Sequence, residues 1–205
     1  HPQGSHIAWI AWNHPQMPWD GTELRLASLQ VASGQVASGQ VVLGGITSLA
    51  GDENTAIFQP QFSPDGRYLA YVSDQSGWWQ LYLYDLQSHE HQQLTNENAE
   101  FGIPAWVQGM RTYGFSPDGK TIYAIRIQDA ACSLWQVDIQ SGQSQSLPLP
   151  KEYTWLEQIA IHPQEDKIAL IASGSRTSDR LITYNRPNGV QIRRRSTSED
   201  LPTST

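Results

Sequence analysis

Apolar residues gather in short runs along the chain, and each run is bounded by turn-forming residues. The run at 68–73 is apolar at successive positions, which predicts a strand buried on both faces rather than a half-exposed one. The run that follows it, at 80–86, alternates more, so we expect that strand to be less buried. Helical periodicity is hard to find anywhere in the sequence.

One turn pattern precedes these runs and occurs four times. It consists of a small or polar residue, proline, a polar residue and usually glycine. Its prolines are Pro2, Pro64, Pro117 and Pro163, at intervals of 62, 53 and 46 residues. Proline presets φ at the first central turn position, and Gly66 or Gly119 supplies a left-handed conformation without steric cost. Such a turn joins two antiparallel strands.

The remainder of each repeat is also similar from copy to copy. One strand precedes the turn, the apolar run follows it, and a more alternating strand and a polar strand come after, as at 57–62, 68–73, 80–86 and 91–95. Four short antiparallel strands repeated at this spacing are typical of a β-propeller blade. A β-sandwich built from meanders is the alternative, but it has no reason to repeat one turn at the same place in every sheet.

We therefore predict an all-β protein, a β-propeller with about four blades. The blades are expected at about 1–52, 53–96, 97–149 and 150–192, followed by a linker at 193–205. The first blade is incomplete, because residues 1–4 already form the turn between its first and second strands. An arc of a larger ring of six to eight blades is the expectation, and a closed four-bladed ring is the alternative. The tandem VASGQVASGQ at 31–40 is expected to be a flexible extension of a turn.

Composition excludes several classes of function. A net charge of −7 argues against a non-specific nucleic-acid binder, and the basic triplet at 193–195 is expected at a solvated strand edge or in the linker. No apolar run is long enough to predict a membrane span. The single cysteine, Cys132, excludes an internal disulfide, and we expect it to be reduced and buried. A cytoplasmic location is expected.

Two irregular loops, at 12–22 and 96–111, are the candidates for binding. Both are rich in tryptophan and charged residues, and loops on a rigid scaffold commonly carry binding residues. The side chains expected to line the channel or one rim are Trp12, His14, Trp19, Asp20, Glu100, Trp106 and Arg111. The alternative is that the tryptophans only fill gaps between blades.

The sequence contains no catalytic or cofactor signature. It lacks a Gly-x-Ser-x-Gly nucleophile elbow, a Walker loop, an HExxH motif and an EF-hand loop. We therefore expect no catalytic residue, no cofactor and no metal in this chain. His89 and His91, separated by Glu90, could contact a metal together, but no third ligand is evident and a solvated turn is expected.

Longer segments resemble known families. The repeats at 63–73 and 116–125 resemble those of TolB-like propellers. The segments at 7–24 and 99–115 resemble the propeller of bacterial prolyl oligopeptidase family (S9) serine peptidases, in the acylaminoacyl-peptidase-like branch. The likeness extends over about residues 1–200 and includes the tail from Arg194, which resembles the exit from that propeller.

This resemblance implies a two-part enzyme. A C-terminal α/β-hydrolase domain would carry the catalytic Ser, Asp and His, and the propeller would cover its active site and admit short peptides. The triad does not lie in this chain, so its own enzymatic activity is left uncertain. In some family members an acidic propeller residue meets the amino terminus of the substrate, and Glu100 is the position to test.

The expected partners are accordingly the hydrolase domain of the same polypeptide and short peptide substrates, with neither nucleic acid nor a membrane. A stand-alone TolB-like propeller that binds a protein partner is the alternative. A third hypothesis is that the chain is an enzyme on its own.

Overall fold

The computed structural model describes residues 1–31, 41–107 and 109–197. Within these ranges the chain forms fifteen strands and no helix. The strands make one three-stranded and three four-stranded antiparallel sheets, each a meander in chain order. The turn extension expected at 31–40 falls on residues 32–40, outside the described residues.

The strands of each sheet are adjacent in the sequence. The first sheet contains β1 (His6–Ala11), β2 (Glu23–Val31) and β3 (Val41–Ala50). The second contains β4 (Ile57–Phe62), β5 (Tyr68–Ser73), β6 (Gln80–Asp85) and β7 (His91–Gln93). The third contains β8 (Tyr113–Phe115), β9 (Thr121–Gln128), β10 (Ala131–Asp138) and β11 (Ser144–Leu147). The fourth contains β12 (Trp155–Ile161), β13 (Ile168–Gly174), β14 (Thr177–Asn185) and β15 (Gly189–Arg195).

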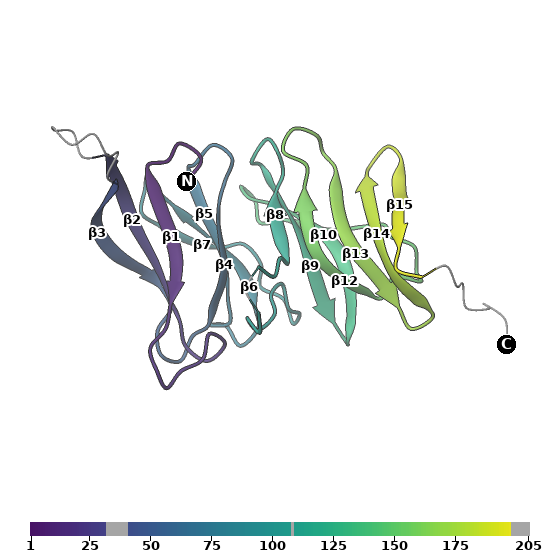
Figure 1. Cartoon of the computed structure of the whole chain (residues 1–205), viewed down its shortest axis with the longest axis horizontal. Helices are drawn as coiled ribbons and strands as arrows, with labels where there is room; N and C mark the ends of the chain where they lie inside the picture. The colour runs from purple at the N-terminus through teal and green to yellow at the C-terminus, as the bar shows by residue number, and fades with distance from the viewer. Residues whose placement is uncertain (32–40, 108, 198–205) are drawn as a thin grey trace.

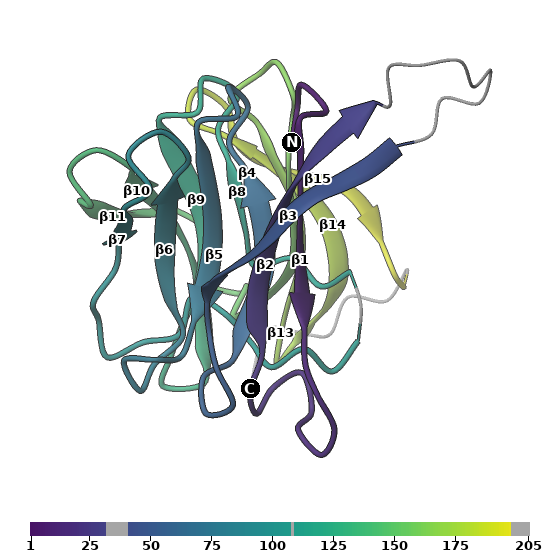
Figure 2. The same cartoon turned by 90° about the vertical axis from the view of Figure 1, so that its left-hand side faces the viewer.

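The four sheets follow one another in chain order along the long axis of the molecule (Figure 1). Figure 2, turned by a quarter, shows them one behind another. Three apolar clusters fill the spaces between successive sheets. This arrangement is the predicted β-propeller of about four blades, in which the first blade has one strand fewer than the others. The triplet at 193–195, which we expected at a solvated strand edge or in the linker, forms the exposed end of β15.

The repeated turn is held by a serine and an aspartate. The Ser63 hydroxyl donates to the Asp65 carboxylate over 2.6 Å and accepts the backbone N–H of Tyr68 over 2.9 Å. The bond from Ser63 holds the pKa of Asp65 below its usual range. Ser116 and Asp118 repeat the same contact, also over 2.6 Å, in the third blade. The turn motif therefore builds scaffold, and both serines are buried.

Burial confirms one expectation about the strands and corrects another. β5 is buried from Leu69 to Ser73, as its apolar run predicted. β6 is equally buried, so the expectation of lower burial for 80–86 was wrong. Its leucines pack toward the third sheet, whereas Tyr82 and Tyr84 pack toward the first, where the tyrosine rings contribute apolar surface. β13 buries alternate positions, since a neighbouring described sheet covers only one of its faces.

A buried glutamine joins the second and third blades. Gln59 lies in a bulge of β4 with a φ of 50°. Its side-chain N–H donates to the carbonyl of Tyr113 over 2.7 Å, and its Oε1 accepts the N–H of Thr112 over 2.7 Å. The Tyr113 hydroxyl donates in return to the Gln59 carbonyl. Two strands from different sheets are thus bonded to each other through side chains.

We predict that Gln59→Ala lowers the free energy of unfolding by about 2 kcal/mol or more, because the N–H of Thr112 and the carbonyl of Tyr113 lose the side chain that bonds them. The matched control is Gln158→Ala. Gln158 occupies the corresponding bulge of β12 with a φ of 55°, but its side chain is exposed. Chemical denaturation of both variants measures the difference. Equal losses would show that strain from alanine at positive φ, and not the lost bonds, dominates.

A histidine joins the first and second blades. The His91 Nδ1 is 2.9 Å from the Tyr71 hydroxyl, and the backbone of Leu49, in β3, also bonds the ring. The centroids of the Tyr84 and His91 rings are 4.8 Å apart. Burial lowers the pKa of His91 from its ordinary value, and the Leu49 bond opposes part of that shift. The neutral form of the His91 imidazole is therefore favoured at this contact between the first and second blades.

From the lowered pKa of His91 we expect the folded protein to lose stability in acid. The pKa of His91 is lower in the folded state than in the unfolded chain, so below about pH 6.5 the unfolded chain binds more protons than the folded protein. The free energy of unfolding therefore decreases as the pH is lowered through this range. We expect His91→Gln to show a smaller decrease in melting temperature between about pH 7.5 and about pH 5 than the unmodified protein. His89→Gln is the control, because the His89 ring bonds the Tyr84 hydroxyl within its own blade, and it should retain the full decrease. An unchanged decrease in His91→Gln would contradict the assignment.

Candidate functional site

A cavity of about 480 Å³ lies between the first two blades and reaches the third. Residues of β1, β4 and the two predicted loops line it. They are Trp9, Ile10, Trp12, Pro18, Ile57, Phe58, Gln59, Pro60, Gln61, Ala105, Gly109 and Arg111. The bulge of β4, which contains Gln59 and Pro60, therefore lines the cavity and also makes the contact between the second and third blades.

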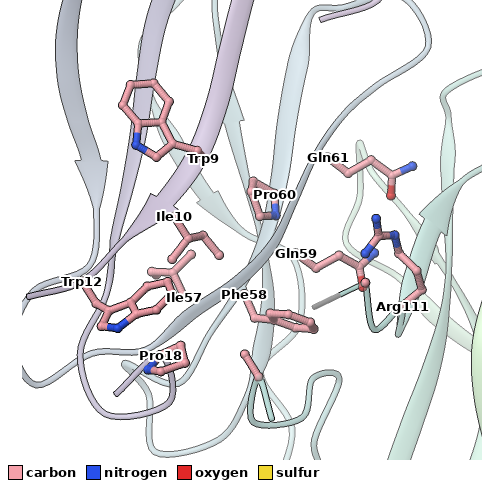
Figure 3. A pocket seen from close by; sticks show the side chains of 12 residues that line it. Trp9, Ile10, Trp12, Pro18, Ile57, Phe58, Gln59, Pro60, Gln61 and Arg111 are labelled. Carbon is pink, nitrogen blue, oxygen red and sulfur yellow. The ribbon is translucent and has the colours of Figure 1, made fainter. Parts of the chain in front are cut away.

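Apolar and polar side chains occupy different sides of this cavity. Figure 3 shows Trp9, Ile10 and Trp12 on one side, and Gln61 and Arg111 on the other. Among the described residues that line it, Arg111 carries the charge. The cavity therefore offers an aromatic wall and a basic, hydrogen-bonding side.

The two irregular loops meet beside the cavity. The rings of Trp19 and Trp106 have centroids 4.4 Å apart at an interplanar angle of 43°. Trp106 is 62 % exposed and Trp12 is 43 % exposed, so both rings are accessible to a ligand. Sequence reasoning grouped these loops by composition, and the structure brings Trp12 and Arg111 into one cavity with the paired tryptophans nearby.

The structure places the other predicted site residues outside this cavity. His14 is exposed on its loop, and the Asp20 carboxylate accepts the N–H of Met17 over 3.0 Å, as in a local turn. Glu100 accepts the N–H of Trp79 over 2.6 Å. Burial raises the pKa of Glu100, and the Asp74 carboxylate adds to that rise. A binding role for His14, Asp20 or Glu100 stays a prediction.

Sequence reasoning missed the contribution of β4. We treated 57–62 only as a strand, yet Gln59 and Gln61 form part of the polar side of the cavity. The signal was Pro60, because proline inside a strand marks an edge or a bulge. A bulge bends a strand and redirects its side chains.

The beginning of the second loop is anchored between two blades. The Arg126 Nε donates to the Glu97 carboxylate over 2.7 Å, and the Ser144 hydroxyl donates to it over 2.9 Å. The Gln80 side-chain amide donates to the carbonyls of Glu97 and Ala99 over 2.9 and 2.8 Å. These bonds hold the loop from its first residues and so help to position its tryptophan.

The two histidines considered for a metal each contact a tyrosine. The Nδ1 atoms of His89 and His91 are 2.9 Å from the hydroxyls of Tyr84 and Tyr71. In the described ranges, no group of three or more His, Cys, Asp and Glu side chains is arranged to hold a metal ion. A search of the same residues found no helix that is long and apolar enough to cross a membrane.

We predict an energetic coupling of about 0.5–1 kcal/mol between Trp19 and Trp106, measured from the free energies of unfolding of Trp19→Ala, Trp106→Ala and the double variant. The control cycle pairs Trp19 with Trp78, an exposed tryptophan on another loop, and should give a coupling near zero. Strict additivity of Trp19→Ala and Trp106→Ala would show that the ring contact does not join the loops.

Two solved peptidases share both fold and sequence with the chain. A puromycin-hydrolyzing peptidase of Mycobacterium tuberculosis is 28 % identical, with a TM-score of 0.81 over 98 % of this chain and 29 % of that one. A puromycin hydrolase is 26 % identical, with a TM-score of 0.79 over 97 % of this chain and 28 % of that one. The chain therefore spans less than a third of the length of these peptidases.

More distant structures share the fold alone. Prolyl oligopeptidase B of Galerina marginata is 12 % identical and has a TM-score of 0.67 over 98 % of this chain and 26 % of that one. A putative TolB of Agrobacterium tumefaciens is 16 % identical, with a TM-score of 0.56 over 82 % of this chain and 60 % of that one. Both are consistent with the resemblances in the sequence.

The family comparison supports the same assignment. The model of the dipeptidyl peptidase IV (DPP IV) N-terminal region matches residues 34–164, which is more than half of the chain. That family is the N-terminal propeller of S9 peptidases, in agreement with the fold and with the two peptidases above. The chain therefore belongs to the DPP IV N-terminal region family and is a propeller region of the S9 peptidase type.

Proposed function

We propose that this propeller controls the access of short peptides to a serine hydrolase domain of the same polypeptide. The observation that carries the proposal is the likeness of 98 % of the chain to a puromycin-hydrolyzing peptidase of which it spans only 29 %. The remaining length of such a relative is more than enough for a further domain. The catalytic serine, histidine and aspartate would come from that domain.

The mechanism would be exclusion by a rigid body. The bonds of the Gln59 side chain to the third blade and of the His91 ring to the backbone of Leu49 link successive blades, so the sheets resist separation. A ring of six to eight blades built in this way would admit substrates that fit past its channel or its side opening. Residues on the rim, among them Trp12, Trp106 and Arg111, would add contacts worth about 1 kcal/mol each.

Two parts of the protein would share the work of the reaction. The propeller selects substrates by size, while bond cleavage belongs to the hydrolase domain. The described residues of this chain supply a hydrophobic and basic surface at the entrance, and we assign no catalytic residue to them.

In the protein expressed from the complete reading frame, we expect cleavage of short fluorogenic peptides and a fall in kcat/KM of at least about tenfold for long unstructured substrates such as casein, equal to about 1.4 kcal/mol in the barrier. Replacing the serine of a Gly-x-Ser-x-Gly motif by alanine should abolish both activities. Equal cleavage of short and long substrates would refute gating, and a reading frame without such a motif would refute the partnership with a hydrolase.

A TolB-like module that binds a protein partner is the second candidate. It is favoured by the fold shared with the putative TolB, which the chain matches over 60 % of that protein's length. A reading frame that ends without a hydrolase, together with a stable partner in pull-down experiments, would support it.

A further inference from the structure

We propose that the outer edge of β3 binds the same edge of a second copy of this protein. The two β3 strands would pair antiparallel across a two-fold axis and join two propellers through one continuous sheet. This inference is independent of the proposed function, because it concerns the outer rim of the propeller and not the route to a hydrolase domain.

The edge in question lies on the outside of its blade. β3 pairs with β2 and, within the described chain, with no other strand. It corresponds to β7, β11 and β15, which are also the last strands of their sheets. The last strand of a blade lies farthest from the central channel, so its outer edge faces outward whatever the number of blades. Figure 2 shows the far ends of β2 and β3 extending beyond the neighbouring sheets.

The other outer strands are protected against pairing with another chain, whereas β3 is not. β7 and β11 have only three and four residues, and β15 ends in three arginines. Short length and charged side chains are the usual means of preventing association through a strand edge. β3 has ten residues and contains no Asp, Glu, Lys or Arg. It therefore has neither form of protection.

A glycine in the middle of β3 also points to a second backbone. Gly44 must be glycine, since an added Cβ would lie 2.0 Å from the Ser28 Oγ. A Cβ on Gly45 would meet no described atom within 4 Å, and Gly45 is not among the described glycines with a positive φ. Packing within the described chain therefore gives no reason for glycine at 45. Glycine inside a strand weakens it and often marks the close approach of another backbone.

Charge and shape favour a second copy as the occupant. Beside β3 the charges of β2 neutralise each other, because the Arg25 Nε is 3.0 Å from the Glu23 carboxylate. The edge therefore suits a long, uncharged strand that has a free edge of its own. Among the four described outer strands, β3 itself meets these requirements. Two copies of one strand, related by a two-fold axis, offer each other the same donors and acceptors.

The free part of the edge sets the centre and the strength of the contact. The backbone of Leu49 already bonds the His91 ring, which leaves residues 42–48. Pairing of this stretch with its own copy centres on Gly45, so residue 45 of one copy would lie beside residue 45 of the other. The stretch is about 23 Å long, which makes a small contact. We therefore expect a reversible dimer.

Analytical ultracentrifugation of the protein expressed from the complete reading frame tests the inference. We expect a monomer that converts to a dimer as the concentration rises. Gly45→Lys should raise the dissociation constant at least about tenfold, because two ammonium groups would lie side by side at the two-fold axis. Gly45→Ala should raise it far less. Gln92→Lys, on the exposed outer strand of the second blade, should leave it unchanged.

A charge exchange separates a second copy from any other occupant. Gly45→Glu should weaken the dimer as Gly45→Lys does, whereas an equimolar mixture of the two variants should form a mixed dimer, since opposite charges then meet. Only pairing of the edge with itself brings two residues 45 together. Circular dichroism of each variant checks that the propeller is folded.

Several results would overturn the inference. These are a protein that stays monomeric at every concentration, a dimer that folded Gly45→Lys does not weaken, and a mixture of the lysine and glutamate variants that does not associate. Amide hydrogen exchange adds one more. Protection of residues 42–48 in the monomer would show that another segment of the same polypeptide already occupies the edge.

Discussion

The structure depends on one constraint, that a sheet with two apolar faces must be covered on both sides. A single antiparallel sheet cannot cover itself, so each blade needs a neighbour on each face. β5 and β6 show the result, because nearly every side chain in them is buried between the first and third sheets. The three apolar clusters are the consequences of this packing, and the order of the sheets follows from the order of the repeats.

Polar bonds between blades add specificity to this packing. Gln59 and His91 are each placed where a side chain of one sheet reaches the backbone of the next. Apolar surfaces alone could slide against each other, whereas a buried amide must meet its partners in one arrangement. The bulge that aims Gln59 at the third blade also exposes Gln61 to the cavity, so the same local irregularity serves both packing and the candidate site.

The candidate site combines a rigid strand with two long loops. Trp12 and Arg111 come from segments about a hundred residues apart, and they share a cavity because successive blades lie side by side. Their loops were recognisable from composition, since tryptophan and charge gather in them without the alternation of a strand. His14, Asp20 and Glu100 have the same composition signal but lie elsewhere, with Asp20 and Glu100 bonded to nearby backbone.

The sequence by itself determined the repeat, because proline, aspartate and glycine act on the local backbone and mark each turn wherever they occur. From the turns followed the strands, the blades and the β-propeller. Only the tertiary structure decided that both faces of β6 are covered, which bonds Gln59 makes and which loop residues meet. Those properties depend on contacts between segments far apart in the chain. The apolar pattern within one segment does not indicate which other segments pack against it.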